Sequence, residues 1–308
     1  MFTLLSSCQE KPIIALDVLV RSDAGAPVAE CDVWAQTFAR WEPGQGFGTD
    51  VYDEHKIRTG VDGIAHLEMP SLRGDLEFKA LPPDGYYPNF EDGHQFKESI
   101  AGKWVVDPPM IETMLKRIKN PIPMYAKNLT NEGGGPLYIP VADKDLAYDL
   151  VGGDWLVPYG KGKTGDIVFH HTFQKDPSGN SKRVIKITFP GKNDGLIVFD
   201  RDLWKGSKLR SDYEAPDQGY QPAVTLVRTI IESKVTDDAK LDRNYYFRVR
   251  SKLDEDGNII SANYGKIYGD FMSFIYYFNP TPNDRNVEFD PSRNLLKIEG
   301  VYRGVLIP

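Results

Sequence analysis

The sequence predicts a mainly β protein with two domains, each built from antiparallel strands. Aromatic residues are frequent, with 16 Tyr and 15 Phe, and so are turn formers, with 28 Gly and 22 Pro. Aromatic side chains favour strands, and Gly and Pro favour the turns between strands. Several segments alternate apolar and polar residues with a period of two, which is typical of strands with one buried face. The length of 308 residues exceeds that of one ordinary sandwich and predicts two domains.

Composition and charge narrow the range of partners. Hydrophobic residues make up 41% of the chain and charged residues 26%, as in globular proteins. The net charge of -7 gives no general attraction to nucleic acid or anionic lipid, so we expect no nucleic-acid partner. No stretch approaches the roughly 20 apolar residues of a membrane-spanning helix.

Residues 1–12 are interpreted as a leader and a linker. Leu5-Ser6-Ser7-Cys8 resembles the lipobox of bacterial lipoproteins, in which a lipid is attached to the cysteine. The resemblance implies an exported protein of the cell envelope, in the periplasm or on the outer surface, that contacts the membrane only through a lipid on Cys8. The basic segment and most of the apolar segment that precede a lipobox are missing, so either the signal begins upstream of Met1 or the match is accidental. A Cys8–Cys31 disulfide also stays open.

The first domain is placed at residues 13–117 and is expected to be a β-sandwich. Apolar residues predict strands at residues 14–20, 32–38, 64–69 and 75–80, although Ile64, Leu67 and Met69 do not alternate strictly. Residues 111–117 allow either a last strand or one helical turn.

Turn motifs between these strands carry a family resemblance. They are Asp23-Ala24-Gly25-Ala26-Pro27-Val28, Thr59-Gly60-Val61-Asp62-Gly63 and Pro82-Pro83-Asp84-Gly85-Tyr86-Tyr87. Together they resemble the carboxypeptidase-regulatory-like, or transthyretin-like, sandwich over roughly residues 13 to 90, and bacterial Ig-like adhesin repeats share much of the pattern. Residues 39–57 depart from it as an insertion. The resemblance implies a domain that supports, spaces or binds, with no catalysis of its own.

The second domain is placed at residues 118–308, and its centre is a predicted hairpin within residues 242–280. Tyr245, Phe247 and Val249 alternate with polar neighbours, and Asp256-Gly257 supplies the turn. Further strands are predicted at residues 167–169, 183–189, 196–199, 223–231, 271–278 and 301–307, with a short helix at 143–150. The strands at 183–189 and 196–199 are expected to pair in a meander. The strand at 271–278 is apolar on both sides, so we expect cover on both faces. The domain is expected to be a larger antiparallel β-sandwich, or a bent sheet, of about ten strands.

Motifs for catalysis or metal binding are weak. Gly162-Lys163-Thr164 lacks the earlier glycine of a phosphate-binding loop and precedes a predicted strand, which favours a simple turn. The acidic turns at 176–180 and 254–258 lack the later ligands of a calcium loop. His170-His171 would point to opposite faces of a strand and could not easily share a metal. We therefore expect no metal and no cofactor, and catalytic residues stay unknown.

Aromatic residues in loops are the most suggestive binding candidates. Rings among polar loop residues suit stacking on sugars or recognition of proteins, although they can equally close the ends of a sandwich. The candidates are Trp41, Tyr52, Trp155, Tyr159, Trp204, Tyr213 and Tyr220. A row of Arg248, Arg250 and Lys252 could bind an anion or form a solvated strand face.

These observations predict a non-enzymatic binding or structural module of the cell envelope that recognises a glycan or a partner protein. The alternative is a carbohydrate-acting hydrolase with unidentified carboxylates, because such pairs are set by distance in space and leave no trace in sequence. An intracellular protein is a third reading if the lipobox is accidental.

Overall fold

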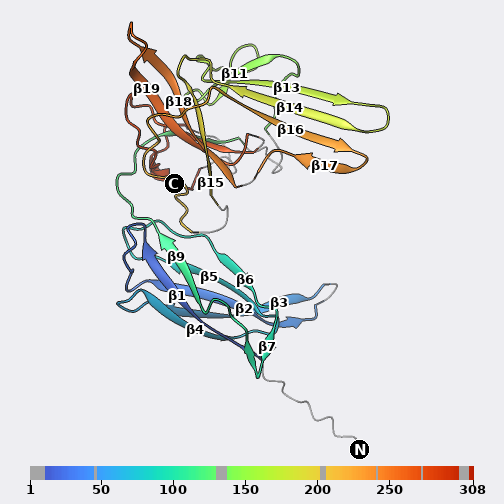
Figure 1. Ribbon diagram of the computed structural model, residues 1–308, viewed down its shortest axis with the longest axis vertical. Helices are drawn as coiled ribbons and strands as arrows, with labels where there is room; N and C mark the ends of the chain where they lie inside the picture. The colour runs from blue at the N-terminus through green and yellow to red at the C-terminus, as the bar shows by residue number, and fades with distance from the viewer. Residues whose placement is uncertain are drawn as a thin grey trace, which may run out of the picture. The chain divides into compact units, whose positions relative to one another are not determined.

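The computed structural model describes residues 11–44, 47–129, 137–201, 206–240, 242–271, 273–297 and 305–308. Within these ranges it contains 20 strands and one 3-10 helix, η1 (Pro291–Arg293), so the mainly β prediction is confirmed (Figure 1). No described helix has the length and apolar character to cross a membrane. The chain forms two compact units that divide after Lys119, and residues 206–208 group with the first unit.

The first unit is built from two sheets. Its strands are β1 (Ile13–Ser22), β2 (Asp32–Glu42), β3 (Thr49–Arg58), β4 (Ile64–Pro70), β5 (Asp75–Leu81), β6 (Asp92–Gln95), β7 (Ser99–Ile100), β8 (Lys103–Trp104) and β9 (Met110–Leu115). One sheet has the order β3-β2-β5-β6, and the other has the order β4-β1-β8-β7, with β9 parallel to β1. The stretch at 111–117 thus contains a strand and no helical turn.

One apolar core lies between these sheets. Ile14, Leu16 and Val18 of β1 are buried, and they belong to one cluster with Val33 of β2 and Phe78 of β5. Their alternate spacing follows from the period of two, which turns every second side chain inward. Each large apolar side chain buried here contributes about 1.5–3 kcal/mol.

Cys31 is buried in this core with a free thiol. Burial, with a smaller effect of the nearby Asp32 carboxylate, raises the pKa of the thiol to about 11. Such a thiol stays protonated at neutral pH and is a poor nucleophile. Cys8 and its predicted lipid lie outside the described residues.

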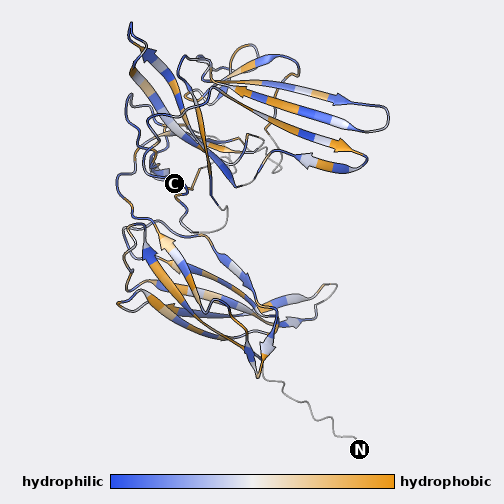
Figure 2. Cartoon of the chain, in the orientation of Figure 1, coloured by the Kyte–Doolittle hydropathy of each residue, from blue (hydrophilic) through white to orange (hydrophobic). Residues whose placement is uncertain are grey.

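The second unit is also a sandwich. Its strands are β10 (Tyr125–Asn128), β11 (Asp145–Asp149), β12 (Asp154–Trp155), β13 (Ile167–Lys175), β14 (Ser181–Thr188), β15 (Gly195–Asp200), β16 (Ala223–Ile231), β17 (Lys234–Asp237), β18 (Arg243–Leu253), β19 (Ile259–Tyr268) and β20 (Ile275–Phe278). A five-stranded sheet has the order β10-β20-β19-β18-β15, and a six-stranded sheet has the order β12-β11-β13-β14-β16-β17. Hydrophilic residues are interleaved with hydrophobic ones along the strands of both units (Figure 2).

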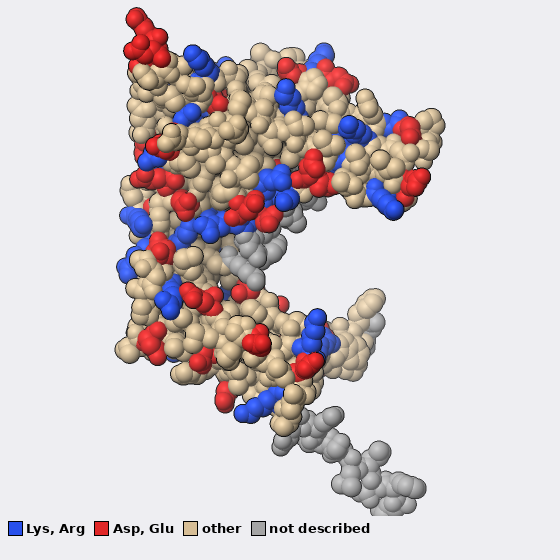
Figure 3. All heavy atoms as spheres, viewed as in Figure 1, with Lys and Arg blue, Asp and Glu red and all other residues tan. Residues whose placement is uncertain are grey.

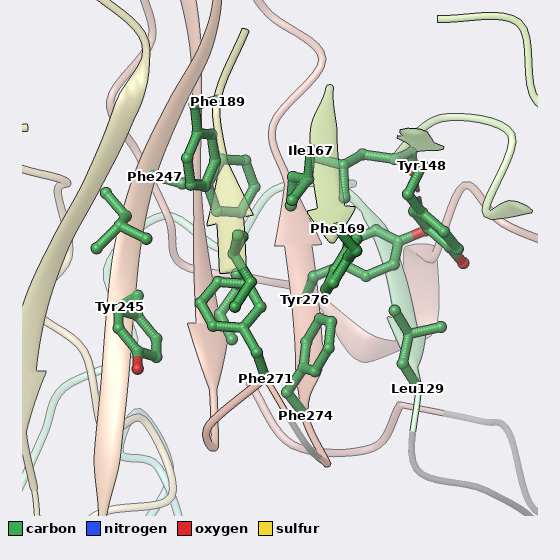
Figure 4. Close-up of a cluster of buried hydrophobic side chains, with 14 of the residues drawn as sticks. Leu129, Tyr148, Ile167, Phe169, Phe189, Tyr245, Phe247, Phe271, Phe274 and Tyr276 are labelled. Atoms are coloured by element: carbon green, nitrogen blue, oxygen red, sulfur yellow. Dashed lines mark hydrogen bonds between the residues drawn. The ribbon is translucent and has the colours of Figure 1, made fainter. Parts of the chain in front are cut away.

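Aromatic side chains fill the space between these two sheets. Phe169 from β13 packs edge-on against Phe271, at 6.1 Å between ring centroids, and Phe271 packs against Tyr245 at 5.0 Å. Figure 4 shows these rings with Phe274 and Tyr276 in one cluster. Tilted and edge-on ring pairs are the favoured aromatic geometries, so this core is specific in shape as well as apolar.

The five-stranded sheet is covered on its second face as well. Two smaller clusters lie there, one around Tyr277 and Phe289 and one around Tyr246 and Val287. The covering chain is irregular and consists mainly of residues 209–222 and 284–290, which pair with each other at Glu214 and Asn286. The expected cover on both faces of β20 is therefore confirmed, although the strand is shorter than residues 271–278.

The hairpin at the centre of the unit is confirmed, with β18 paired to β19 in antiparallel register. Its turn holds Gly257 at a φ of 86°, and the Asp254 N–H donates to the Asn258 carbonyl at 2.9 Å. A bulge follows Val249, where Arg250 has a φ of 58°. The bulge breaks the alternation that the sequence predicts for the end of β18.

Two predictions for the second unit are wrong, and a third lies mostly outside the described residues. Residues 143–150 contain β11 and no helix, because Leu146 and Tyr148 alternate into the core beside Phe169. The strands at 183–189 and 196–199 do not pair as a meander, since β14 pairs with β13 and β16 while β15 pairs with β18 in the other sheet. The strand expected at residues 301–307 lies mostly outside the described ranges, which omit residues 301–304, and residues 305–307 form no strand.

Candidate binding face

The β2–β3 hairpin carries two of the predicted aromatic residues. β2 pairs with β5 only from Asp32 to Gln36, whereas its pairing with β3 continues to Glu42 and Thr49. The expected insertion at residues 39–57 is thus mostly the end of this long hairpin. Trp41 is 54% exposed and Tyr52 is 41% exposed.

A bulge in β2 places these two rings on one face. Phe38 pairs with Tyr52 and Trp41 pairs with Asp50, with a register shift between Phe38 and Arg40 that takes up the extra residue. Tyr52 and Asp50 are two residues apart on β3 and share a face, and directly paired residues share a face as well. We call this surface of Trp41, Tyr52 and their neighbours the hairpin face.

Neighbouring groups hold the hairpin face in shape. The Arg73 guanidinium lies 3.4 Å from the Phe38 ring centroid and donates to the Asp50 carboxylate at 2.9 Å. Phe38 meets the edge of Tyr52 at 6.2 Å between centroids. Gly48 lies against the Trp41 indole so closely that a Cβ at this position would overlap the ring. Two exposed rings beside a fixed ion pair form a surface for stacking and hydrogen bonding.

The other predicted aromatic residues belong to the second unit and differ in exposure. Trp155 is 8% exposed and packs edge-on against Tyr148 and Phe169, so it closes the sandwich and cannot stack on a ligand. Tyr159 is 38% exposed in the loop that follows β12. Tyr213 is half-buried, and its carbonyl accepts from the Val287 N–H.

Tyr220 is half-buried, with its hydroxyl donating to the Pro216 carbonyl at 2.6 Å. Burial raises the pKa of this hydroxyl well above its usual range. Trp204 lies outside the described residues. Of the seven predicted aromatic residues, the structure therefore brings together Trp41 and Tyr52.

The predicted row of exposed cations is wrong. Arg248 is buried, where it donates to the carbonyls of Asn193 at 2.8 Å and Asp217 at 2.9 Å and lies over the Tyr220 ring. Arg250 turns away at the bulge and donates to both oxygens of Asp166, at 2.7 and 2.9 Å. These side chains tie strands and loops together and leave no row of free cations.

The Gly162-Lys163-Thr164 loop surrounds an internal anion. Lys163 and Thr164 donate their N–H groups to Oδ2 of Asp149 at 2.8 and 3.2 Å, and Val151 and Gly152 donate to Oδ1 at 2.9 and 3.0 Å. Burial raises the pKa of Asp149, but these four backbone hydrogen bonds outweigh it and lower the pKa below 3.8. A carboxylate of the chain occupies the position that a phosphate would need.

The two acidic turns are also occupied by their own groups. Asp176 Oδ1 accepts from Ser178 and Asn180, and Asp254 accepts from the N–H and side chain of Asn258. Among the described residues, no group of three or more His, Cys, Asp or Glu side chains is arranged to hold a metal ion.

Two surface grooves of the molecule differ from a glycosidase active site. One has a volume of about 390 Å³ and is lined by one carboxylate, Glu91, which binds Lys79. The other has a volume of about 400 Å³ and is also lined by one, Asp176, which is held by its own turn. A glycosidase needs two carboxyl groups about 5–10 Å apart, and neither groove supplies them. Over the face in Figure 3, acidic and basic side chains are mixed.

No protein-family model and no curated protein matches the sequence. Among solved structures, the chain is similar to a DUF3823 family protein from Parabacteroides merdae, with 10% identity, a TM-score of 0.20 and coverage of 91% of this chain and 100% of the other. It is similar to the full-length major pilin SpaD from Corynebacterium diphtheriae, with 11% identity, a TM-score of 0.24 and coverage of 92% and 84%. The chain is also similar to BcpA, the major pilin subunit of Bacillus cereus, with 10% identity, a TM-score of 0.23 and coverage of 90% of this chain and 99% of the other. TM-scores this low assign neither a fold nor a function to the chain.

Proposed function

We propose that this protein is a non-enzymatic module of the bacterial cell envelope that binds a glycan or an envelope protein through the hairpin face. The first unit would be a transthyretin-like or Ig-like sandwich, as its turn motifs suggest. The observation that carries the proposal is the pair of exposed rings, Trp41 and Tyr52, on one side of a hairpin that continues past the rest of its sheet.

Two features indicate that the exposed rings of Trp41 and Tyr52 serve to bind a ligand. An exposed aromatic ring leaves apolar surface in contact with water, which is unfavourable unless a ligand covers it. A rigid ring also loses little conformational entropy when it binds. Arg73 and Asp50 fix the polar edge of the same surface. The hydrolase alternative has less support, because each of the two grooves is lined by one carboxylate that already has a partner.

The binding test uses Trp41→Ala and Tyr52→Ala in the full chain on an array of envelope glycans and in a pull-down from envelope extract. Each substitution removes a stacking surface and should weaken the same interaction about 5- to 30-fold, since an aromatic contact contributes about 1–2 kcal/mol.

The matched control is Phe173→Ala, which removes a ring that is 49% exposed on β13 of the second unit. Binding that survives both hairpin variants, or that is lost equally in the control, would place the ligand elsewhere and contradict the proposal.

The envelope location is tested separately, by lipid labelling of the protein expressed with its upstream sequence. Label on the wild type that disappears in Cys8→Ala would support the anchor at Cys8. If the protein carries no lipid label and is found in the cytosolic fraction, the proposed envelope location is contradicted. An intracellular partner is then favoured.

A further inference from the structure

The groove of about 390 Å³ in the first unit has the size of a small-ligand site. It lies where the end of β5 meets residues 88–91 and the short segment at 206–208. This segment is fixed by backbone hydrogen bonds, from Phe90 to the Gly206 carbonyl at 2.9 Å and from Lys208 to the Pro88 carbonyl at 2.8 Å. The groove is therefore shaped by paired backbone.

Asn89, one of the residues that line this groove, has a buried acceptor without a partner. Asn89 is 5% exposed, and its Nδ2 donates to Thr113 Oγ1 at 2.9 Å and to the Met114 carbonyl at 3.3 Å. Its Oδ1 is buried and has no hydrogen-bond partner in the described structure. Because a buried polar atom without a partner is unfavourable, Asn89 Oδ1 is suited to a ligand that brings an O–H or N–H donor.

Charge in the groove is unevenly paired. The Lys79 ammonium donates to Glu91 at 2.6 Å and lies 4.6 Å from the Trp34 ring centroid. Lys208 lies 5.9 Å from the Phe90 ring centroid and forms no ion pair within the described part of the chain. With two ammonium groups and one carboxylate, the lining has one positive charge left over.

We propose that this groove binds an acidic sugar, such as one uronic acid residue of a glycan chain. A sugar hydroxyl would donate to Asn89 Oδ1, the carboxylate would pair with Lys208, and the apolar face of the ring would lie on Phe90 and Pro82. The proposal rests on the groove alone and stands whether or not the hairpin face binds a ligand.

The test is a titration of the isotope-labelled full chain with tri-galacturonate, followed by amide chemical shifts. Shifts should move at residues 79–81 and 89–91. The methyl ester of the same trisaccharide keeps the ring and hydroxyls but not the charge, and it should bind about tenfold more weakly. Lys208→Gln should weaken the acid to the level of the ester, and Lys97→Gln, at an exposed lysine of the same unit, should leave binding unchanged.

Three results would overturn the proposal. They are no shift at millimolar tri-galacturonate, equal binding of acid and ester, and tighter binding of tri-glutamate, which would make the groove a peptide site. Trp41→Ala separates the two proposals, since it should weaken binding at the hairpin face and leave the groove titration as in the wild type.

Discussion

Asp149 illustrates how a single side chain can decide the meaning of a motif. The loop around it has the composition of a phosphate-binding loop, but its N–H groups point at a carboxylate of the same chain. Hydrogen bonds to a charged acceptor are among the stronger ones in proteins. The loop residues can be recognised in the sequence, but their hydrogen bonds to Asp149 cannot, because Asp149 precedes the loop by more than ten residues.

Asp149→Asn tests this role. The amide replaces one oxygen with an N–H donor that faces backbone N–H groups, so we expect a loss of about 2–4 kcal/mol in the free energy of unfolding. The measurement is denaturant unfolding at pH 7. Asp154→Asn is a suitable control, since Asp154 accepts two backbone hydrogen bonds, from Trp155 and Lys161, where Asp149 accepts four. An equal loss in both variants would contradict the special role of Asp149.

The same aspartate should contribute to the acid sensitivity of the protein. Its pKa is lower in the folded chain than its ordinary value of 3.8, so its stabilisation is complete above that value and is lost as pH falls through the folded pKa. Burial raises the pKa of Asp166, against the opposing effect of Arg250, and this acts in the opposite direction. The difference in unfolding free energy between wild type and Asp149→Asn should therefore shrink below pH 4. A difference that stays constant from pH 7 to pH 2 would exclude this contribution.

The identity of a residue and of its sequence neighbours could not predict how deeply its side chain is buried. Trp155 and Trp41 both lie among polar and glycine residues in the sequence, yet one closes a core and the other is exposed. Arg248 occupies the polar side of an alternating strand, but that side is covered by the chain around Tyr220. Because these covering segments are distant in sequence, local pattern could not distinguish the exposed rings of Trp41 and Tyr52 from the buried ring of Trp155.

At the scale of elements, local pattern predicted strands well and pairing poorly. The alternation in β1, β2 and β5 reflects one-sided burial and is readable from sequence. The Lys192–Gly195 turn looked like a hairpin, but it carries the chain from one sheet to the other, and Asp194 accepts from the N–H groups of Arg250 and Ser251 at 3.0 Å. Which strands become neighbours depends on long-range contacts that composition does not record.

Two hairpin turns share one design and should respond alike. Asp176–Asn180 and Asp254–Asn258 each place glycine fourth, with φ of 94° at Gly179 and 86° at Gly257. An added Cβ meets open space at Gly179 and only the end of a lysine side chain at Gly257. Gly179→Ala and Gly257→Ala should therefore each cost about 1–2 kcal/mol from backbone strain alone. Thermal or denaturant unfolding of the two variants measures this, and a large cost at one site alone would show that packing matters.

At the scale of the molecule, each unit has its own buried core. Ile14 and Ile187 are both fully buried, the first in the core of the first unit and the second in that of the second. Ile14→Val and Ile187→Val make the same change and should each cost about 0.5–1.5 kcal/mol. Calorimetry should resolve two transitions, of which each variant lowers one by a few degrees. A single transition that both variants lower equally would show that the units unfold together.

Most of the candidate site follows from one hairpin, whereas the groove could not have been predicted. Trp41 and Tyr52 lie on the paired strands β2 and β3 and are close in sequence, although both were expected in an insertion and β3 was not predicted as a strand. Asn89 and Lys208 belong to segments more than a hundred residues apart, and only folding brings them to one groove.

The five-stranded sheet of the second unit is covered on both faces, and this affects how its strands are held in register. A one-residue slip normally exposes an apolar face, but β18 and β19 are covered on both sides, so burial hardly distinguishes one alignment from the next. Gly265 supplies the missing distinction. Gly265 pairs with Phe247 on one side and with Phe278 on the other. The Phe247 ring occupies the space that a side chain at position 265 would need. A slip of β19 would bring Tyr264 or Lys266 under that ring, so steric fit at one glycine, more than hydrophobicity, holds these strands in alignment.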